Sequence, residues 1–379
     1  MRSNGRPPAR GEIVHVVGAR PNFVKMAPII EALARRDDVH QYVVHTGQHY
    51  DARMSDEMLT DLQFPEPDRF LGIGSGTHGA QTGRALIDFE QVLLERQPAL
   101  VVVGGDVNST VACALAAAKL GIAVAHVESG LRSGDWTMPE EINRVLTDRL
   151  SDLLFIHSPE AVDNLAAEGI PADRVHSVGN TMIDSLRKFE GPARERAKWH
   201  ELGLTQREYV LITLHRPSNV DHPVRLNLLV DALCELGRRA PAVFPIHPRT
   251  RAQLEATGRL TDLERAGLRC EAPFGYLDFL SLELGAGAVL TDSGGVQEET
   301  SALGIPCYTL RPNTERPVTI AQGTNVLLGD DAAEIVQVAP SSRAPEPCLI
   351  PLWDGHAGER IADALALVPR ALVPSGPGR

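Results

Sequence analysis

One short segment of the chain carries residue types suited to binding a nucleotide. An apolar run ends in the sequence Thr-Asp-Ser-Gly-Gly-Val-Gln-Glu-Glu at residues 291–299, where a helical pattern begins. A helix start with free backbone N–H groups and no bulky side chains in front of it can hold a phosphate, here at Ser293, Gly294 and Gly295. Glu299 lies one turn further along and could reach the hydroxyl groups of an attached ribose. The segment therefore predicts a nucleotide site.

Three further acidic residues, Asp106, Glu128 and Glu140, follow predicted strands or open a predicted helix. Two of them have a structural alternative, because an isolated Asp at such a turn would usually cap a helix and Glu140 could pair with Arg144 at i,i+4. Gathered in one cleft, however, carboxylates can take different pKa values and act as separate acid and base. We therefore treat all three as candidate proton-transfer groups.

Cations and histidines occupy similar positions. Arg20 and Lys25 follow the first predicted strand and could face a ligand, although a helix start with solvated side chains is the alternative. His215 and His247 end the first two strands of the second half of the chain. An isolated His is more often a packing residue, but two at successive strand ends favour a function. They lack the spacing of a zinc-binding His pair, so no metal site is predicted.

The elements that must position these residues are alternating strands and helices. The first set of strand-length apolar runs is 13–17, 42–45, 100–103, 124–127, 153–156 and 175–178, and the second is 210–214, 242–246, 288–290, 306–309 and 326–328. Such alternation predicts parallel sheets with helices on both faces. A stretch with Gly191 and Pro192 separates the sets, which predicts two doubly wound, Rossmann-like domains facing each other across a cleft, with ligands at the carboxyl ends of the strands.

Length and composition restrict the class of protein. A chain of 379 residues exceeds the usual size of one domain. The formal net charge of -12 disfavours a nucleic-acid or anionic-membrane partner, and no apolar window is long enough to span a membrane. Five widely spaced cysteines suggest neither disulfides nor a zinc site. Residues 1–11 contain no signal-peptide pattern and are predicted to be a disordered tail, so we expect a cytoplasmic protein.

Two common nucleotide-binding motifs do not apply. Residues 74–79 match the pattern GxGxxG, but they do not follow the first strand, and no acidic residue evidently closes the second strand of that unit. We therefore reject a dehydrogenase fingerprint. The pattern GxxxxGK[ST] is absent from the sequence, which argues against ATP hydrolysis of the P-loop type.

Several segments resemble, in unbroken order, the motifs of the non-hydrolysing UDP-N-acetylglucosamine 2-epimerases. They are residues 18–21, 25–28, 105–106, 126–132, 139–144, 179–181, 215–216, 292–299 and 314–317. So many ordered motifs make the resemblance highly specific. It implies a GT-B fold and usually a homodimer. The expected domains are 12–188 and 189–355, and the expected last helix, within 356–379, packs back on the first domain.

The resemblance also implies a reaction, the interconversion of UDP-GlcNAc and UDP-ManNAc. The C2 proton is lost, UDP leaves by anti elimination to give 2-acetamidoglucal, and UDP then adds back with a proton delivered to the other face. No cofactor and no metal is needed. The residue types suit this chemistry, because loss of a weakly acidic C2 proton needs positioned bases and a departing diphosphate needs cations and N–H donors. The product could feed cell-envelope glycans or an aminosugar antibiotic.

The same resemblance assigns roles to residues of this chain. The substrate would be bound by Arg20, Ser293, Gly294 and Gly295 at the diphosphate, Glu299 at the ribose, Phe279 at the uracil, Arg316 at the sugar side, and Arg132 and His247. The acid/base set would be Asp106, Glu128, Glu140 and His215, assisted by Lys25. Many bacterial members are activated by a second UDP-GlcNAc, which would lie near Gln48, His49, Gln81 and Arg216.

The chain departs from the family pattern at Ala19, Asn22 and Ser129, where Thr, Glu and Ala are usual. Asn22 matters most, because it removes a charge beside Arg20 and Lys25 and leaves activation by substrate an open question. Three other functions also stay open. A hydrolysing 2-epimerase would release ManNAc and UDP, a GT-B glycosyltransferase would need an acceptor surface that we cannot identify, and a nucleotide-sugar sensor would have no reason to keep four acid/base candidates.

Overall fold

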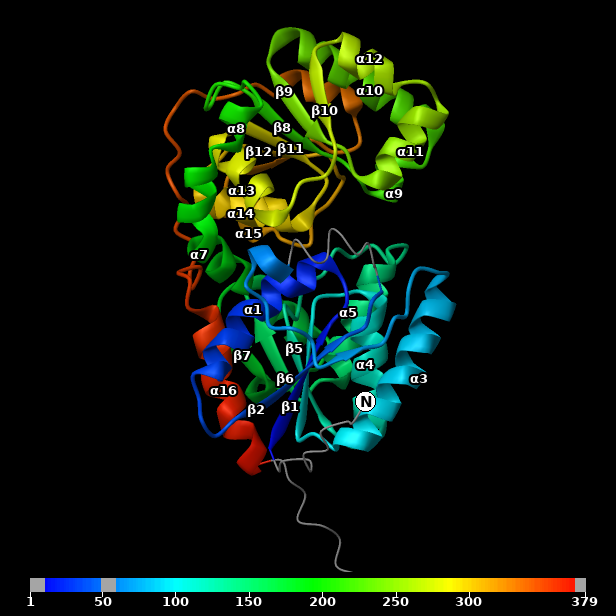
Figure 1. Ribbon diagram of the computed structural model, residues 1–379, viewed down its shortest axis with the longest axis vertical. Helices are drawn as coiled ribbons and strands as arrows, with labels where there is room; N and C mark the ends of the chain where they lie inside the picture. Colours follow the sequence, from blue (N-terminus) through cyan, green and yellow to red (C-terminus); the bar gives the residue numbers. More distant parts are fainter. Residues whose placement is uncertain (1–10, 49–58, 372–379) are drawn as a thin grey trace, which may run out of the picture. The chain divides into compact units, whose positions relative to one another are not determined.

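Figure 1 shows the computed structural model, which describes residues 11–48 and 59–371. The chain divides into two compact units, one formed by the described residues up to Ser185 together with those from Pro351, the other by Leu186–Ile350. Each unit is a parallel sheet flanked by helices, which confirms the predicted α/β class. The tail predicted at 1–11 lies, apart from Gly11, outside the described residues.

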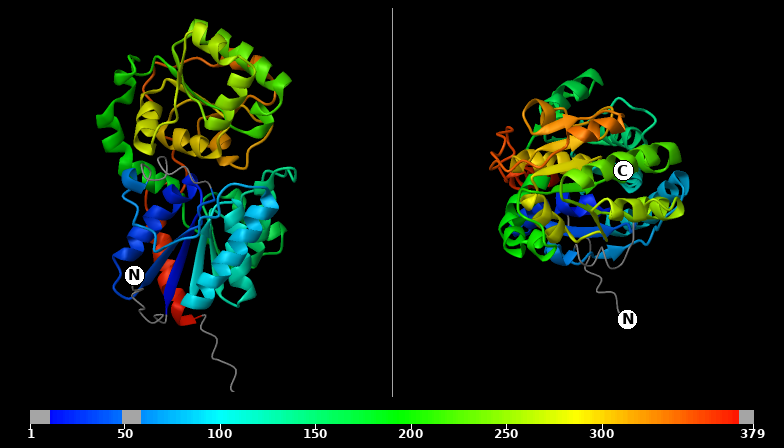
Figure 2. Two further views of the ribbon diagram at one scale, coloured as in Figure 1. Left: turned by 45° about the vertical axis from the view of Figure 1, so that its right-hand side comes forward. Right: turned by 90° about the horizontal axis from the view of Figure 1, so that it is seen from above.

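The first unit is built on a sheet whose described strands are all parallel. They are β1 (Glu12–Val17), β2 (His40–His45), β3 (Arg69–Phe70), β4 (Leu100–Gly104), β5 (Ala123–Val127), β6 (Leu153–Ile156) and β7 (Val175–Ser177), in the order β3-β2-β1-β4-β5-β6-β7. Helices cover both faces of this sheet (Figure 2), which explains why β1 and β4 are buried along their whole length and largely apolar, with Glu12 and His15 as the polar residues of β1. The strand order reverses between β1 and β4, where such sheets bind ligands.

The helices of the first unit connect these strands. They are α1 (Arg20–Ala34), α3 (His78–Arg96), α4 (Asn108–Lys119), α5 (Pro139–Leu150), α6 (Glu160–Ala167), the short η1 (Ala172–Arg174) and α16 (Ala357–Ala371). The last of these, α16, packs against α1, where Gly358 lies so close to Pro28 that a Cβ atom would clash with it. The Asp184 carboxylate accepts the N–H groups of Ala357 and Gly358 and so caps the start of α16.

The second unit has a second parallel sheet. Its described strands are β8 (Val210–Thr213), β9 (Ala242–Pro245), β10 (Leu268–Glu271), β11 (Ala288–Thr291), β12 (Cys307–Thr309) and β13 (Asn325–Leu327), in the order β10-β9-β8-β11-β12-β13. Its helices are α8 (Lys198–Glu201), α9 (Pro217–Val220), α10 (Pro223–Arg239), α11 (Pro248–Ala256), α12 (Leu260–Arg265), α13 (Tyr276–Gly285), α14 (Gly294–Leu303), α15 (Val318–Ala321) and η2 (Ala332–Gln337). Here the order reverses between β8 and β11, the strands that precede His215 and Asp292.

Two features of the fold differ from the sequence-based expectation. Helix α7 (Thr181–Arg196) continues through Gly191 and Pro192, where we expected a break between domains. Strands β3 and β10 were not expected, and both lie at the edge of their sheet. Edge strands are paired on one side only and need no continuous apolar run, so the pattern that identifies central strands does not detect them.

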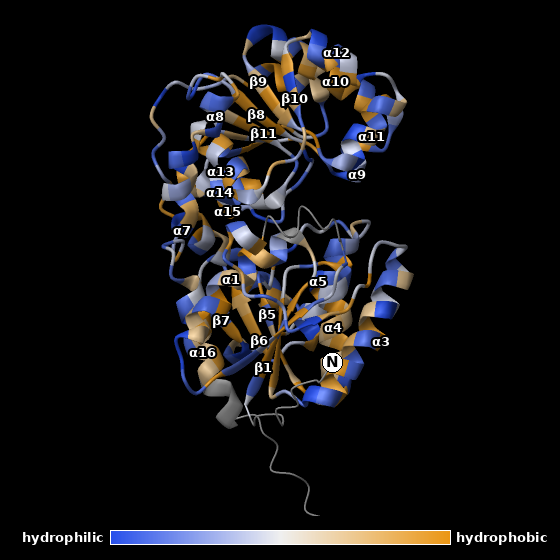
Figure 3. Cartoon of the chain, in the orientation of Figure 1, coloured by the Kyte–Doolittle hydropathy of each residue, from blue (hydrophilic) through white to orange (hydrophobic). Residues whose placement is uncertain are grey.

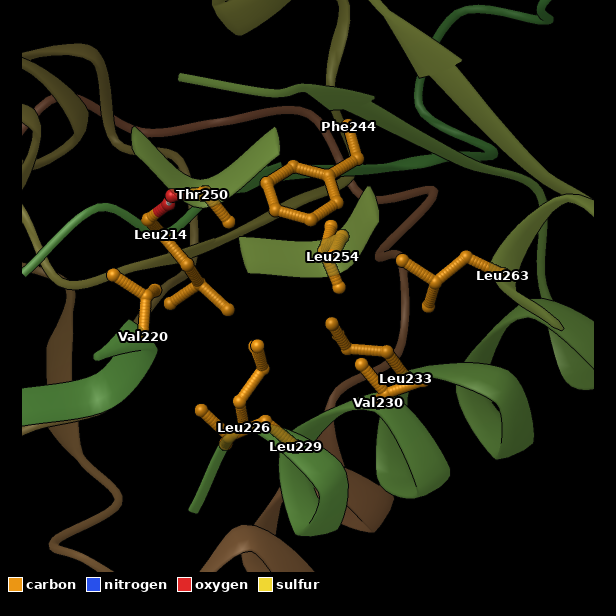
Figure 4. A pocket seen from close by; sticks show the side chains of 10 residues that line it. All are labelled: Leu214, Val220, Leu226, Leu229, Val230, Leu233, Phe244, Thr250, Leu254 and Leu263. Carbon is orange, nitrogen blue, oxygen red and sulfur yellow. Dashed lines mark hydrogen bonds between the residues drawn. The ribbon is translucent and has the colours of Figure 1, made fainter. Parts of the chain in front are cut away.

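A small cavity of the second unit lies inside its hydrophobic core. Figure 3 shows the strands of each sheet as largely hydrophobic, and Figure 4 shows that Leu, Val and Phe244 side chains line the cavity. Its one polar lining residue, Thr250, donates its hydroxyl hydrogen to the carbonyl oxygen of Leu214 at 2.7 Å. A cavity without a polar group directed into it cannot orient a nucleotide sugar, so we assign it to core packing.

Candidate active site

Asp106, in the turn between β4 and α4, is held by a buried cation. The Arg144 guanidinium of α5 contacts its carboxylate at 2.5 Å and that of Glu141 at 3.0 Å. Glu141 also accepts the backbone N–H groups of Ser133 and Gly134, which ties this cluster to the loop before α5. The side chain of Arg144 is 2% exposed and that of Asp106 is 27% exposed. Asp106 therefore has a fixed orientation and still offers its carboxylate to a ligand.

Glu128 follows β5 and forms an ion pair with Lys25 of α1, in which both side chains are largely buried. The backbone of Glu128 has a φ of +66°, a conformation that non-glycine residues seldom adopt and that often marks functional sites. Gly105 lies beside this pair, where a Cβ atom would be 3.3 Å from the Lys25 amino group. Glu140, the remaining predicted acid of this unit, lies half-buried in the first turn of α5.

Asn22, the main departure from the family pattern, has a clear structural role. Its side-chain oxygen accepts the backbone N–H groups of Gly18 at 3.3 Å and Ala19 at 2.8 Å, and its amide group donates to the carbonyl oxygen of Gly104 at 2.7 Å. Asn22 thus caps the start of α1 and joins the turn after β1 to the end of β4. The side chain of Arg20, on the same turn, lies outside the described residues.

Arg132, in the loop that follows Glu128, belongs to a network of ion pairs around the buried Asp148. It contacts Asp148 at 2.8 Å and Glu168 at 2.6 Å, and Asp148 also bonds to the His126 ring at 2.6 Å. Burial by itself would raise the pKa of Asp148, but His126 and Arg132 overcome this effect and lower it. The network fixes the loop that follows Glu128, so the structure gives Arg132 a supporting position.

Two residues predicted for an activating site lie together at the start of α4. The Gln81 amide donates to the carbonyl oxygens of Gln48 and Gly74, and the Gln48 side chain accepts the Ser109 N–H at 2.7 Å. His49 lies outside the described residues. Arg216 belongs to the second unit, where it donates to the carbonyl oxygen of Asp292 at 3.0 Å.

His215 follows β8 and is oriented by Asp292, which follows the neighbouring strand β11. Its ring nitrogen Nδ1 lies 3.1 Å from the Asp292 carboxylate, and its ring centroid is 5.6 Å from that of His247. Asp292 also accepts the backbone N–H groups of His215 and Arg216 and the Asn219 amide. Burial would raise the pKa of Asp292, but these partners overcome it and lower that pKa to about 2. A permanently ionised carboxylate therefore fixes the His215 ring.

The start of α14 has the features of an anion site. Ser293 is the N-cap of α14 and its side chain makes no capping hydrogen bond, so it leaves the backbone N–H groups of the first turn for a ligand, while the Ser293 N–H itself is donated to the Thr291 hydroxyl at 2.9 Å. A Cβ atom on Gly294 would lie 2.3 Å from the Arg316 guanidinium, so only glycine lets this cation approach the helix start so closely. Arg316 is held there by Glu298 at 2.8 Å and Glu315 at 2.5 Å. N–H donors and a fixed cation together suit a phosphate.

Further along α14, Glu299 lies in an acidic, buried environment. Burial, with Glu298 adding to it, raises the pKa of Glu299 to about 8, and the Tyr276 hydroxyl lies 3.4 Å from its carboxylate. Glu283 of α13 is fully buried beside it, and neither of its carboxylate oxygens has a hydrogen-bond partner among the described residues. Phe279, on the same helix, is half-buried.

The structure therefore gathers the predicted residues in two sets, one at the carboxyl edge of each sheet. The first comprises Lys25, Gln48, Gln81, Asp106, Glu128, Arg132 and Glu140, and the second His215, Arg216, His247, Phe279, Ser293, Gly294, Gly295, Glu299 and Arg316. Our sequence analysis missed the orienting roles of Asp292, Glu141 and Arg144. Asp292 carried a usable signal, because it lies between a buried strand and a helix start.

Comparison with known proteins agrees with this geometry. The family model of UDP-N-acetylglucosamine 2-epimerase matches residues 31–366. Over 358 residues the chain is 43% identical to the UDP-N-acetylglucosamine 2-epimerase of Methanocaldococcus jannaschii, a match that covers 92% of this chain and 97% of that relative. The chain belongs to the UDP-N-acetylglucosamine 2-epimerase family. The predicted resemblance and the predicted enzyme class, an isomerase of the non-hydrolysing type, are thereby confirmed.

Two further comparisons extend this result. The crystal structure of the M. jannaschii UDP-GlcNAc 2-epimerase in complex with UDP-GlcNAc and UDP has a TM-score of 0.87 at 41% identity and covers 94% of this chain and 99% of that one, which confirms the predicted GT-B class. The UDP-2,3-diacetamido-2,3-dideoxy-D-glucuronate 2-epimerase of Pseudomonas aeruginosa is 42% identical, over 94% of this chain and 99% of its own. Among the described helices, none combines the length and apolarity that crossing a membrane requires.

Proposed function

We propose that this epimerase interconverts UDP-GlcNAc and UDP-ManNAc. A base removes the C2 proton, the bond between C1 and the UDP oxygen breaks on the opposite face to give 2-acetamidoglucal, and UDP adds back as a proton reaches C2 from the other side. The observation that carries the proposal is that Asp106 and Glu128 each lie beside a fixed cation, Arg144 and Lys25. Such pairs hold a carboxylate in a fixed orientation, as proton abstraction requires.

The other residues have roles that follow from their positions. Ser293, Gly294, Gly295 and Arg316 would stabilise the charge on the departing diphosphate with N–H donors and a cation, together with Arg20. Glu299 would accept the ribose hydroxyls, Phe279 would pack on the uracil, and Arg132 and His247 would support the sugar and His215. Asp106, Glu128, Glu140 and His215 form the acid/base set, with Lys25 holding Glu128. These four groups would share the removal of the C2 proton on one face of the sugar and its delivery on the other.

A second candidate substrate is a UDP-2,3-diacetamido-2,3-dideoxy-glucuronate. The relative named for it is 42% identical to this chain, against 43% for the M. jannaschii UDP-N-acetylglucosamine 2-epimerase. Overall identity therefore does not separate the two substrates. The proton abstraction and elimination at C1 and C2 would be the same, and the substrates differ in the groups at C3 and C6.

The test is incubation of the enzyme with each nucleotide sugar in deuterated water, followed by proton and phosphorus NMR. We expect UDP-GlcNAc to give UDP-ManNAc with deuterium at C2 and the diphosphate retained. Release of free ManNAc and UDP would show a hydrolysing enzyme instead. Turnover of the diacetamido sugar alone would replace the first substrate by the second, and no deuterium exchange with either would contradict the epimerase proposal.

We also propose that the enzyme is a cytoplasmic homodimer without a cofactor, and that Gln48, His49, Gln81 and Arg216 form an activating site for a second UDP-GlcNAc. The domain limits expected from the resemblance, 12–188 and 189–355, belong to this proposal. Sedimentation at equilibrium measures the oligomeric state. A hyperbolic rate with UDP-GlcNAc, together with turnover of UDP-ManNAc alone, would contradict activation.

A further inference from the structure

His157, which our sequence analysis did not select, lies beside the proposed acid/base pair of the first unit. It directly follows β6, the neighbour of the strand that carries Glu128. Its side chain lines the same small cavity as Lys25, Glu128 and Asn180. A ring nitrogen of His157 and a carboxylate oxygen of Glu128 lie within 4.8 Å of each other. A polar ring in this position can interact with Glu128 directly or through one water molecule.

The His157 ring and backbone are held in place by the segment before α16. The Trp353 indole packs edge-on against the imidazole, with ring centroids 6.1 Å apart and an angle of 84°. The indole N–H also donates to the carbonyl oxygen of His157 at 2.8 Å. His157 is 5% exposed and Trp353 is 6% exposed. The imidazole is therefore oriented before any ligand arrives, as a residue that positions another must be.

Asn180 is a further polar residue that lines this cavity. The side-chain oxygen of Asn180 accepts the Met182 N–H at 2.9 Å, while its amide nitrogen is buried and has no hydrogen-bond partner among the described residues. A buried donor without a partner costs free energy and is seldom kept without a function. The cavity is thus lined by the Lys25 cation, the Glu128 carboxylate, the His157 imidazole and the Asn180 N–H donor.

We infer that His157 is a positioning residue for Glu128, which orients its carboxylate and balances its charge during proton transfer. The inference rests on the proposed function. Lys25, from α1, forms an ion pair with the Glu128 carboxylate. The imidazole of His157 lines the same cavity, and an imidazole N–H can donate a hydrogen bond to a carboxylate directly or through one water molecule. One proton leaves the substrate C2 for a base and another is delivered to C2 from the opposite face, so the step balances without a further reactant.

The experiment compares His157→Leu and His157→Gln with a matched control, His176→Leu. His176 lies on β7 of the same sheet, where its ring packs on Phe155 with centroids 5.6 Å apart. We expect His157→Leu to lower kcat by about 30- to 100-fold with KM changed less than about threefold, and His157→Gln to recover much of the loss. This is at or below the roughly 10²- to 10⁴-fold of a general acid or base, because His157 acts through Glu128. His176→Leu should keep wild-type kcat.

A double-mutant cycle separates positioning from general support of the fold. In a Glu128→Asp background the shortened carboxylate has already lost its alignment, so His157→Leu should cost less than about threefold further. Equal losses in both backgrounds, or a wild-type kcat for a folded His157→Leu protein, would overturn the inference. If the unaltered enzyme exchanges no deuterium with either sugar, the proposed function has failed, whereas wild-type turnover with an indifferent His157 rejects this inference alone.

Discussion

The carboxylates of the two proposed site regions have different surroundings. In the first unit, Asp106 and Glu128 each form an ion pair with a cation from another element, so both carboxylates are held in a fixed orientation. In the second unit, Asp292 is held as an ion mainly by His215 and N–H donors, whereas Glu283 and Glu299 are buried and have raised pKa values. The first arrangement suits proton abstraction and the second suits binding and orientation, although the two sheets share one fold.

The largest expected effect tests the first half of this comparison. Asp106→Asn and Glu128→Gln each keep the shape of the side chain and remove the base, so kcat should fall by about 10²- to 10⁴-fold with little change in KM. Steady-state rates of deuterium exchange at C2 measure this. Asp173→Asn, an exposed site on η1, is the control and should be unchanged. Wild-type turnover by either folded variant would remove that residue from the acid/base set.

Asp292→Asn should produce the next largest effect, mainly on stability. The new amide group would face the N–H donors of His215, Arg216 and Asn219, so we expect a loss of about 2–4 kcal/mol at pH 7. The folded pKa of Asp292 is about 2, below the ordinary value, so its contribution is present above about pH 4 and disappears as the pH falls towards 2.

Urea unfolding at pH 7 and at about pH 3 measures this contribution, and the difference between wild type and variant should shrink at the lower pH, which lies between the unfolded and folded pKa values of Asp292. Asp221 is half-buried and pairs with the exposed Arg249 at 2.5 Å, so Asp221→Asn serves as the control and should cost less than about 1 kcal/mol. Equal stability of Asp292→Asn and wild type at pH 7 would show that the buried ion is not held as we describe.

Glu283 is expected to behave in the opposite way. It is fully buried and its carboxylate has no hydrogen-bond partner among the described residues, so burial and the nearby Glu299 raise its pKa well above the ordinary value. Such a group stays protonated in the folded state while the unfolded chain loses its proton, so it lowers stability increasingly as the pH rises above about 4.5. Glu283→Met, of similar volume, should therefore stabilise the protein by about 1–3 kcal/mol at pH 8.

The measurement is thermal unfolding of Glu283→Met and wild type at pH 5 and pH 8, and the gain should be smaller at pH 5. If the variant is instead less stable at both values, Glu283 makes a favourable interaction in the folded state. A weaker UDP affinity with unchanged stability would indicate that Glu283 acts through Glu299 on the ribose.

The sequence predicted the central strands and placed the proposed site residues at strand ends and helix starts. It did not predict the edge strands or the ion pairs between residues far apart in the chain. Strands such as β1 and β4 are buried along their whole length and largely apolar, whereas β3 and β10 pair on one side only and are partly exposed. A pair with Arg144 was the structural alternative considered for Glu140, and the structure shows ion pairs of Arg144 with Glu141 and with Asp106, 38 positions away. The spacing of residues along one helix does not reveal an ion-pair partner that lies in the turn after a different strand.

Substitution of Asn22 should have the smallest effect on stability, and it tests how charge near Lys25 affects the first unit. Asn22→Ala removes the acceptor for the Gly18 and Ala19 N–H groups, so we expect a loss of about 1–2 kcal/mol in chemical denaturation. Asn22→Asp keeps that acceptor but directs a carboxylate oxygen at the Gly104 carbonyl, and it adds a negative charge near Lys25. Competition for Lys25 would weaken its hold on Glu128, so kcat should fall although the cap is kept. If kcat instead rises, the absence of a charge at position 22 limits the activity of the Lys25–Glu128 pair. The surroundings of the carboxylates in the first unit would then include charged groups beyond their ion-pair partners.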